Sequence, residues 1–189
     1  NGIVCGFSNG TVSLWLERKL GSACRWTEQI LVEDEQKRSI TVVTGLLAEK
    51  ERLLVVSGSS GGATSYTFGF ADNAWTVLSS KVLLRMPVTT AMMAKPSKAS
   101  TNAEMLILLG TASHKHNKIH VWHMRKQGPQ EALYSGALAG HEDWISSLCW
   151  KGQSTTSSLL ASASQDCKIR LWKFVTRSGE TTKTRGDSQ

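Results

Sequence analysis

The chain has 189 residues, a mass of 20.6 kDa and a formal net charge of +7. Its 40% hydrophobic and 20% charged residues are ordinary for a globular protein, which excludes disorder along the whole chain and allows one domain with a sizeable core. No apolar run approaches the roughly 18 residues of a transmembrane helix, and no signal-peptide pattern opens the sequence. Because the first residue is Asn1 rather than Met, we expect a soluble piece of a longer chain.

The four cysteines, Cys5, Cys24, Cys149 and Cys167, form no C-x-x-C pair and lack the spacing of zinc ligands. We therefore expect reduced thiols in a cytoplasmic protein that is also found in the nucleus, with no metal and no cofactor.

The predicted elements are short strands that recur as one unit. Runs rich in Val, Ile, Leu and Trp are separated by Gly, Ser and Thr, and none keeps helical spacing for three turns, which predicts an all-β fold. Hairpins end in an aromatic residue at Trp15, Phe68, Trp122 and Trp172, with spacings of 53, 54 and 50 residues. This regularity indicates an internal repeat.

Each repeat contains the same parts. The hairpin turns are predicted at residues 8–10, 59–62, 114–117 and 165–167. A further strand is predicted before three of the hairpins, at residues 40–43, 88–93 and 145–150, and an outer strand at residues 26–32, 75–82 and 131–135. Residues 95–102 are interpreted as an insertion.

Four strands per roughly 50 residues are typical of a β-propeller blade. The sequence therefore predicts a partial propeller over residues 1–176, about three and a half four-stranded blades of a larger ring. The closing hairpin would occupy residues 1–15, and the blades about 16–68, 69–122 and 123–174. Residues 177–189 carry no apolar side chain and are predicted to be a disordered polar loop or tail.

The last repeat carries the most specific motif. Gly140 and His141 open it, and Ser162, Asp166 and Trp172 follow at spacings that resemble a WD40 repeat, with Leu171-Trp172-Lys173 where that family has Trp-Asp. The resemblance implies a structural hydrogen-bonded chain through His141, Ser162, Asp166 and Trp172. A catalytic His-Asp-Ser triad would use the same residue types, but the G-x-S-x-G elbow that would expose the serine is missing from the sequence.

The run Gly140–Trp144, GHEDW, together with the strand pair ending in Trp172, resembles the Elongator subunit 2 family of WD40 proteins, and residues 118–122 also fit it. The resemblance implies a scaffold without catalytic residues in a complex that modifies wobble uridines of tRNA, whose chemistry lies in another subunit. A WD40 adaptor of another cytosolic or nuclear complex, in signalling or chromatin, is the alternative.

A cluster of histidines allows a different interpretation. His114, His116, His120 and His123 lie within ten residues, so a zinc-dependent hydrolase is a remote alternative. His120 and His123 would point to opposite faces of a strand, which favours a solvated turn over a shared metal centre.

The charged run at residues 33–38 is interpreted as a solvated loop, with a partner contact as the alternative. Residues 58–62 are rich in Gly and Ser but enter a strand, so they lack the helix N-terminus of a phosphate loop.

The expected partners are protein subunits of a multiprotein complex, with no membrane and no small-molecule substrate. Residues 168–189 hold six Lys and Arg against two acidic residues. Lys173, Arg177, Lys183 and Arg185 could therefore make weak, non-specific contact with tRNA phosphates.

Overall fold

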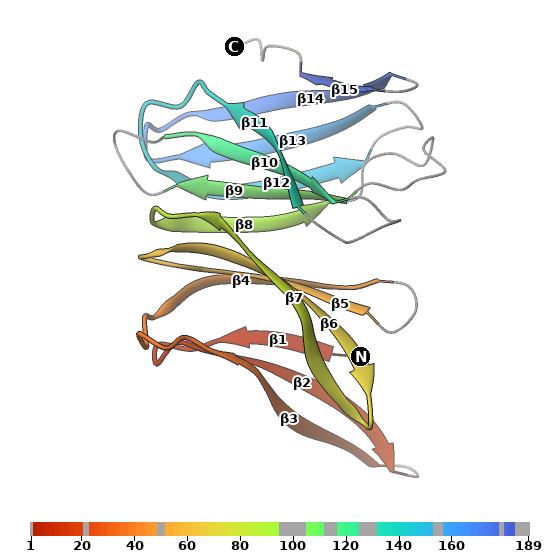
Figure 1. The fold of residues 1–189 in the computed structure, drawn as a ribbon. Coiled ribbons are helices and arrows are strands. Elements are labelled where there is room, and N and C mark those ends of the chain that lie inside the picture. The colour runs from red at the N-terminus through yellow and green to blue at the C-terminus, as the bar shows by residue number, and fades with distance from the viewer. Residues whose placement is uncertain are drawn as a thin grey trace. The chain divides into compact units, whose positions relative to one another are not determined.

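The structure, a computed structural model, describes residues 2–20, 23–48, 52–94, 105–111, 117–124, 132–152, 157–177 and 180–183. These residues are all-β: they form fifteen strands in antiparallel sheets (Figure 1). In the part of the chain described, no helix has the length and hydropathy needed to cross a membrane. The chain divides into two compact units, Asn1–Val88 and Thr89–Gln189.

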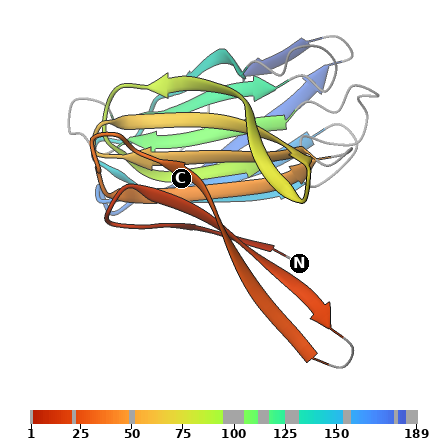
Figure 2. The ribbon, with the colours of Figure 1, turned by 60° about the horizontal axis from the view of Figure 1, so that its bottom comes forward.

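The first unit holds two sheets. One has the strand order β1-β2-β3, formed by β1 (Gly2–Gly6), β2 (Thr11–Leu20) and β3 (Ala23–Glu33). The other has the order β4-β5-β6-β7, formed by β4 (Ile40–Ala48), β5 (Arg52–Ser59), β6 (Gly62–Ala71) and β7 (Ala74–Leu84). Figure 2 shows β2 and β3 as a long twisted hairpin, which their ten and eleven residues allow.

A buried apolar cluster joins the two sheets of this unit. It consists of Val12, Leu14, Leu31, Leu53, Val55 and Phe68. Val55 and Phe68 are fully buried, and burying a side chain of this size contributes roughly 1.5–3 kcal/mol. The Gln29 side chain adds a polar link, since its amide nitrogen donates to the carbonyl of Trp75 at 2.8 Å and its oxygen accepts the Trp75 N–H at 3.1 Å.

The second unit also holds two sheets. One has the order β11-β10-β9-β8, formed by β8 (Val88–Ala94), β9 (Met105–Thr111), β10 (Ile119–Met124) and β11 (Ala132–Leu138). The other has the order β12-β13-β14-β15, formed by β12 (Ile145–Gly152), β13 (Ser157–Ser164), β14 (Ile169–Arg177) and β15 (Glu180–Lys183). The boundary between the units falls directly after the first residue of β8.

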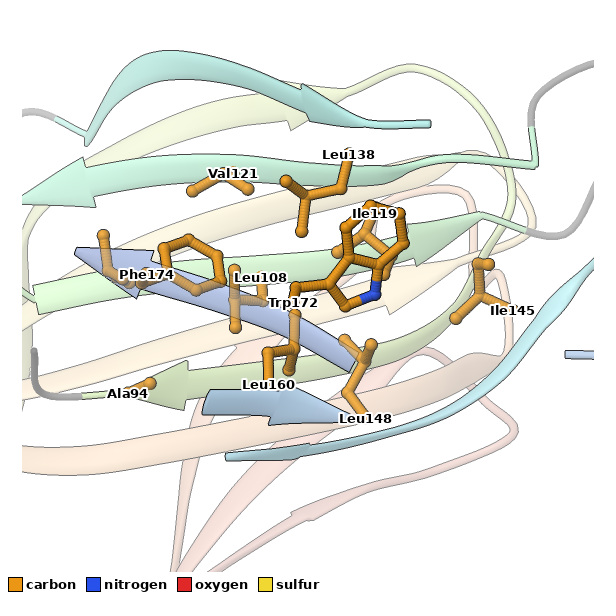
Figure 3. Close-up of a cluster of buried hydrophobic side chains, with 11 residues drawn as sticks. Ala94, Leu108, Ile119, Val121, Leu138, Ile145, Leu148, Leu160, Trp172 and Phe174 are labelled. Carbon is orange, nitrogen blue, oxygen red and sulfur yellow. The ribbon is translucent and has the colours of Figure 1, made fainter. Parts of the chain in front are cut away.

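The core of the second unit is built from alternate residues of both sheets (Figure 3). Its members are Ala94, Leu106, Leu108, Ile119, Val121, Leu138, Ile145, Leu148, Leu160, Trp172 and Phe174. Alternation follows from the strand period of two: in β14, Trp172 and Phe174 are buried while Leu171 is 53% exposed. The indole of Trp172 therefore holds the last hairpin against the preceding sheet.

The repeats of the sequence and the sheets of the structure are offset by one strand. The sequence analysis grouped the outer strand at residues 26–32 with the hairpin that follows it, whereas β3 pairs with β2 of the preceding hairpin. The lengths of the connecting segments explain this pairing, because two residues separate β2 from β3, whereas six separate β3 from β4. The short link favours an antiparallel neighbour in the same sheet, and the longer one allows a step to the next sheet.

The aromatic position of the second hairpin also differs from the prediction. The cross-strand pairs at this position are Ile3 with Trp15, Val55 with Tyr66, Ile107 with Trp122 and Leu160 with Trp172. Tyr66 therefore takes the place that the sequence analysis gave to Phe68, which lies two residues further along β6 and is buried in the core. Tyr66 and Phe68 lie two residues apart and therefore on the same face of β6. The alternating sequence pattern alone does not show which of them holds the aromatic position.

Part of the segment expected to be a disordered tail is a strand. Residues 180–183 form β15 and pair with β14, from Arg177 opposite Glu180 to Phe174 opposite Lys183. Strand pairing is made by backbone N–H and C=O groups, so a segment without apolar side chains can still join a sheet edge. Residues 178–179 and 184–189 lie outside the described part of the chain.

Candidate functional site

The last sheet brings four predicted side chains together. Trp172 Nε1 lies 2.8 Å from Ser162 Oγ, Ser162 Oγ lies 2.8 Å from His141 Nε2, and His141 Nδ1 lies 2.8 Å from Asp166 Oδ2. Trp172 comes from β14 and Ser162 from β13, while His141 precedes β12 and Asp166 lies in the turn between β13 and β14. The chain therefore connects the interior of the sheet with its turn.

Donor and acceptor chemistry gives this chain a direction. An indole N–H only donates and a carboxylate only accepts, so Trp172 donates to Ser162 and His141 Nδ1–H donates to Asp166. Ser162 then gives its single hydroxyl proton to His141 Nε2. This arrangement gives each of the four buried groups a partner, as a buried polar network requires.

The Asp166 carboxyl is the end of the chain and accepts more than one bond. Its side chain is 3% exposed, and Oδ2 also accepts the Glu142 N–H at 3.0 Å, while Oδ1 accepts the Lys168 N–H at 2.9 Å. Burial alone would raise the pKa of Asp166, but the bonds from the Glu142 backbone, His141 and the Lys168 backbone lower it well below its ordinary value. The carboxylate is therefore held ionised and fixes the turn.

The arrangement is unsuited to nucleophilic catalysis. Ser162 is 1% exposed and His141 4% exposed, and the Ser162 hydroxyl lies between the indole and the imidazole. A substrate carbonyl would have to reach an oxygen that the hairpin already encloses. Instead, the bonds from His141 and the Glu142 N–H to Asp166 hold the segment before β12 against the β13–β14 turn.

A serine that the sequence analysis did not select supports the same turn. Ser164 Oγ donates to the carbonyl of Asp143 at 2.9 Å and accepts the Asp166 N–H at 3.2 Å. Ser59 has the same role in the second sheet, where its hydroxyl accepts the Gly61 N–H at 3.1 Å. The signal was available, since both serines end the strand before the turn, but a Ser in a loop is too common to be informative alone.

The turn of the first sheet has a counterpart of the bond that Asp166 accepts from the Lys168 N–H. Asn9 Oδ1 accepts the Thr11 N–H at 3.1 Å, as Asp166 Oδ1 accepts the Lys168 N–H. Asn9 is exposed, whereas the side chain of Asp166 is buried. The same turn geometry is therefore made once at the surface and once as part of an internal network.

The second sheet replaces the network with a different pair. Ser57 occupies the register position of Ser162, and Gly61 follows Ser59 by two residues as Asp166 follows Ser164. Asp34 forms an ion pair with Arg38, from Oδ2 to Nε at 2.8 Å and from Oδ1 to Nη2 at 2.9 Å. The Arg38 guanidinium lowers the pKa of Asp34 to about 2.

The predicted histidine cluster is described only in part. His114 and His116 lie outside the described residues. His120 Nδ1 lies 3.3 Å from the Tyr134 hydroxyl, and His123 Nδ1 is hydrogen bonded to Ser135 Oγ. Within the described ranges, no three His, Cys, Asp or Glu side chains are grouped as a metal site would need. All four cysteines fall in those ranges, and none forms a disulfide.

The sheets and the network together define a class. The chain has the fold of a partial WD40 β-propeller, with antiparallel sheets of three or four strands and the His-Ser-Asp-Trp chain of a WD40 repeat in the last of them. No protein-family model matches the chain.

Individual relatives are found among WD40 proteins. The protein transport protein sec13 of Aspergillus fumigatus is 24% identical over 178 residues, which is 87% of this chain and 55% of the relative. Elongator complex protein 2 of Homo sapiens is 39% identical over 61 residues, which is 32% of this chain and 7% of the relative. A crystal structure of Chaetomium thermophilum Sqt1 aligns with a TM-score of 0.49 and 14% identity, over 90% of this chain and 53% of Sqt1. The chain thus spans about half the length of the sec13 relative.

Proposed function

We propose that the chain is part of a non-catalytic scaffold subunit that assembles other proteins, and that its complex is Elongator, which modifies wobble uridines in tRNA. The observation that carries this proposal is the last repeat, where the GHEDW run and the His141–Trp172 network stand in the pattern that resembles the Elongator subunit 2 family. The 39% identity with human Elongator complex protein 2 over 61 residues supports it.

The chemistry of the network favours a scaffold over an enzyme. Its four side chains bond to one another, and each is buried. A network of this kind stiffens a turn and leaves the outer surfaces of the sheets for partners. The subunit carries no catalytic residue in this proposal, and the radical and acetyl-transfer chemistry of the complex belongs to another subunit.

Affinity purification of the tagged full-length protein tests the proposal. We expect the remaining Elongator subunits to co-purify in stoichiometric amounts and to stay bound after ribonuclease treatment. An untagged culture supplies the control. Recovery of a different set of stoichiometric partners would reject the Elongator assignment and keep the scaffold.

The sec13 relatives favour a second candidate, a scaffold in protein transport. The Aspergillus fumigatus protein aligns with 87% of the chain, far more than the Elongator relative does, although at 24% identity. The same purification separates the two candidates, because a transport scaffold would recover transport proteins. An adaptor in signalling or chromatin would recover neither set.

We further propose that the protein acts in the cytoplasm, with a nuclear pool, and that its basic end makes weak contact with tRNA. Lys173, Arg177, Lys183 and Arg185 would contribute by releasing counterions, so this binding should be insensitive to sequence and steeply reduced between about 50 and 200 mM salt. Binding of the full-length protein to tRNA, measured across this range, should weaken uniformly across RNA sequences and depend less steeply on salt when all four are replaced by Gln. Sequence-selective binding that resists salt would contradict the proposal.

A further inference from the structure

A pocket of about 130 Å³ lies in the first unit, at the place where the second sheet lacks the buried network. Among its lining residues are Ser57, Gly61, Thr64 and Tyr66. Ser57 and Tyr66 stand at the register positions of Ser162 and Trp172 in the last sheet, and Gly61 follows Ser59 by two residues as Asp166 follows Ser164. In the last sheet His141 fills the equivalent space, whereas Gln36 stands four residues before β4 where His141 stands four residues before β12.

The lining of this pocket is largely glycine and apolar side chains, and its polar groups include hydroxyls and two guanidinium groups. Ser57, Thr64 and Tyr66 present hydroxyl groups, and Arg38 and Arg85 also line it. Arg38 uses Nε and Nη2 for Asp34, while Nη1 lies over Gly61, where a Cβ atom would come within 2.1 Å of it. Two N–H groups of Nη1 therefore remain for another acceptor.

Arg85 supplies the net charge of the pocket. It is exposed, and no described carboxylate forms an ion pair with it. The charges of Arg38 and Asp34 cancel in their ion pair, so the pocket has one unbalanced positive charge. A single negative charge complements it, whereas a phosphate dianion would leave an excess charge close to Asp34.

The size of the pocket agrees with a side chain. A cavity of about 150 Å³ accommodates a benzene molecule, so 130 Å³ is sufficient for a carboxylate with its short aliphatic stem. Guanidinium and hydroxyl donors are the usual partners of such a carboxylate. We propose that this pocket binds the side chain of an Asp or Glu that a protein partner inserts between the β5–β6 turn and Arg85.

This inference rests on the proposed scaffold function, and a crosslinking experiment separates the two. Arg85→Lys keeps the charge and places a primary amine at the pocket. In the purified full-length complex, a carbodiimide activates the partner carboxylate, and the amine displaces the activating group as a urea to form an amide. Arg52→Lys is the matched control, because Arg52 is exposed at the other end of β5, outside the pocket.

We expect mass spectrometry to find position 85 joined to an Asp or Glu of a partner at least fivefold more often than position 52. Arg85→Glu should reduce the recovery of that partner at least tenfold, while Arg52→Glu leaves it unchanged. A complex that assembles normally with equal crosslinking at both positions, or with position 85 joined only to Asp34, overturns the pocket proposal. Release of the partner by phosphatase overturns it in favour of a phosphate. If no protein co-purifies at all, the scaffold function itself fails.

Discussion

The turn between β13 and β14 and the turn between β5 and β6 have the same place in their sheets but are stabilised differently. In the last sheet, the Asp166 carboxylate ends a buried chain of side chains and accepts three bonds. In the second sheet, Gly61 stands in its place, and an ion pair of Asp34 and Arg38 lies over it.

The two turns differ in how far their stabilising side chains are buried. His141 and Asp166 have side-chain exposures of 1% and 3%, whereas Arg38 and Asp34 have 40% and 19%. Bonds made away from water are costly to break, because the remaining partners stay buried without a substitute. The buried network therefore gives stability to its turn, and the solvated pair leaves a pocket. One architecture thus gives a rigid turn in one sheet and a space for a ligand in another.

The largest expected effect is that of Asp166→Ala. The change leaves His141 Nδ1 and two backbone N–H groups without their acceptor, so we expect the free energy of unfolding of the full-length protein to fall by about 3 kcal/mol. Asn9→Ala is the matched control, because Asn9 accepts one bond at an exposed turn and should cost less than about 1 kcal/mol. Equal losses in denaturant unfolding would remove the distinction between the two turns.

Adjacent glycines sharpen the comparison in the second sheet. Gly62 has a φ of 139°, and a Cβ there would lie 2.1 Å from the carbonyl oxygen of Leu84, so Gly62→Ala should cost roughly 2 kcal/mol. Gly61→Ala meets the side chain of Arg38 and no backbone atom among its three nearest neighbours, and a partly exposed side chain can move aside, so this change should cost less than about 1 kcal/mol. Thermal unfolding of both variants checks the order, and a greater loss in Gly61→Ala would show that Arg38 is held as rigidly as backbone.

Acid should act on both turns in the same direction. The pKa values of Asp166 and Asp34 are lowered on folding, that of Asp34 to about 2, from an unfolded value near 3.9. Each carboxylate therefore stabilises the protein above about pH 4, and this contribution disappears as the pH falls through the folded pKa. We expect Asp166→Asn to flatten the fall in stability between about pH 5 and 2 more than Asp34→Asn does, because Asp34 is partly solvated. The opposite order in acid titrations of unfolding would contradict the assignment.

The smallest effect is expected for Arg38→Ala. Its ion pair with Asp34 is partly exposed to water, and such pairs contribute at most about 1 kcal/mol. Its loss should also raise the pKa of Asp34 toward the ordinary value, which carboxyl NMR titration measures. Arg52→Ala is the control for removing an exposed arginine from this unit. A loss above 2 kcal/mol would mean that the pair is structural in the same sense as the buried network.

The sequence alone determined the all-β class and the period of the repeat, and its resemblance to a WD40 repeat implied which residues form the last network. The fold class and the repeat period depend on residue type and spacing, because a strand alternates its faces. His141, Ser162, Asp166 and Trp172 matched the WD40 pattern, and the resemblance implied the hydrogen-bonded chain that the structure contains.

The tertiary structure decided what depends on segments meeting in space. It paired β3 with the preceding hairpin, placed Tyr66 instead of Phe68 at the aromatic position, and added β15 through backbone bonds. It also brought Arg38 over Gly61, which follows it by 23 positions, and placed Arg85, 47 positions after Arg38, at the same pocket. A local sequence pattern does not predict such a contact, because the packing of the whole unit determines the strand registers and the positions of the loops.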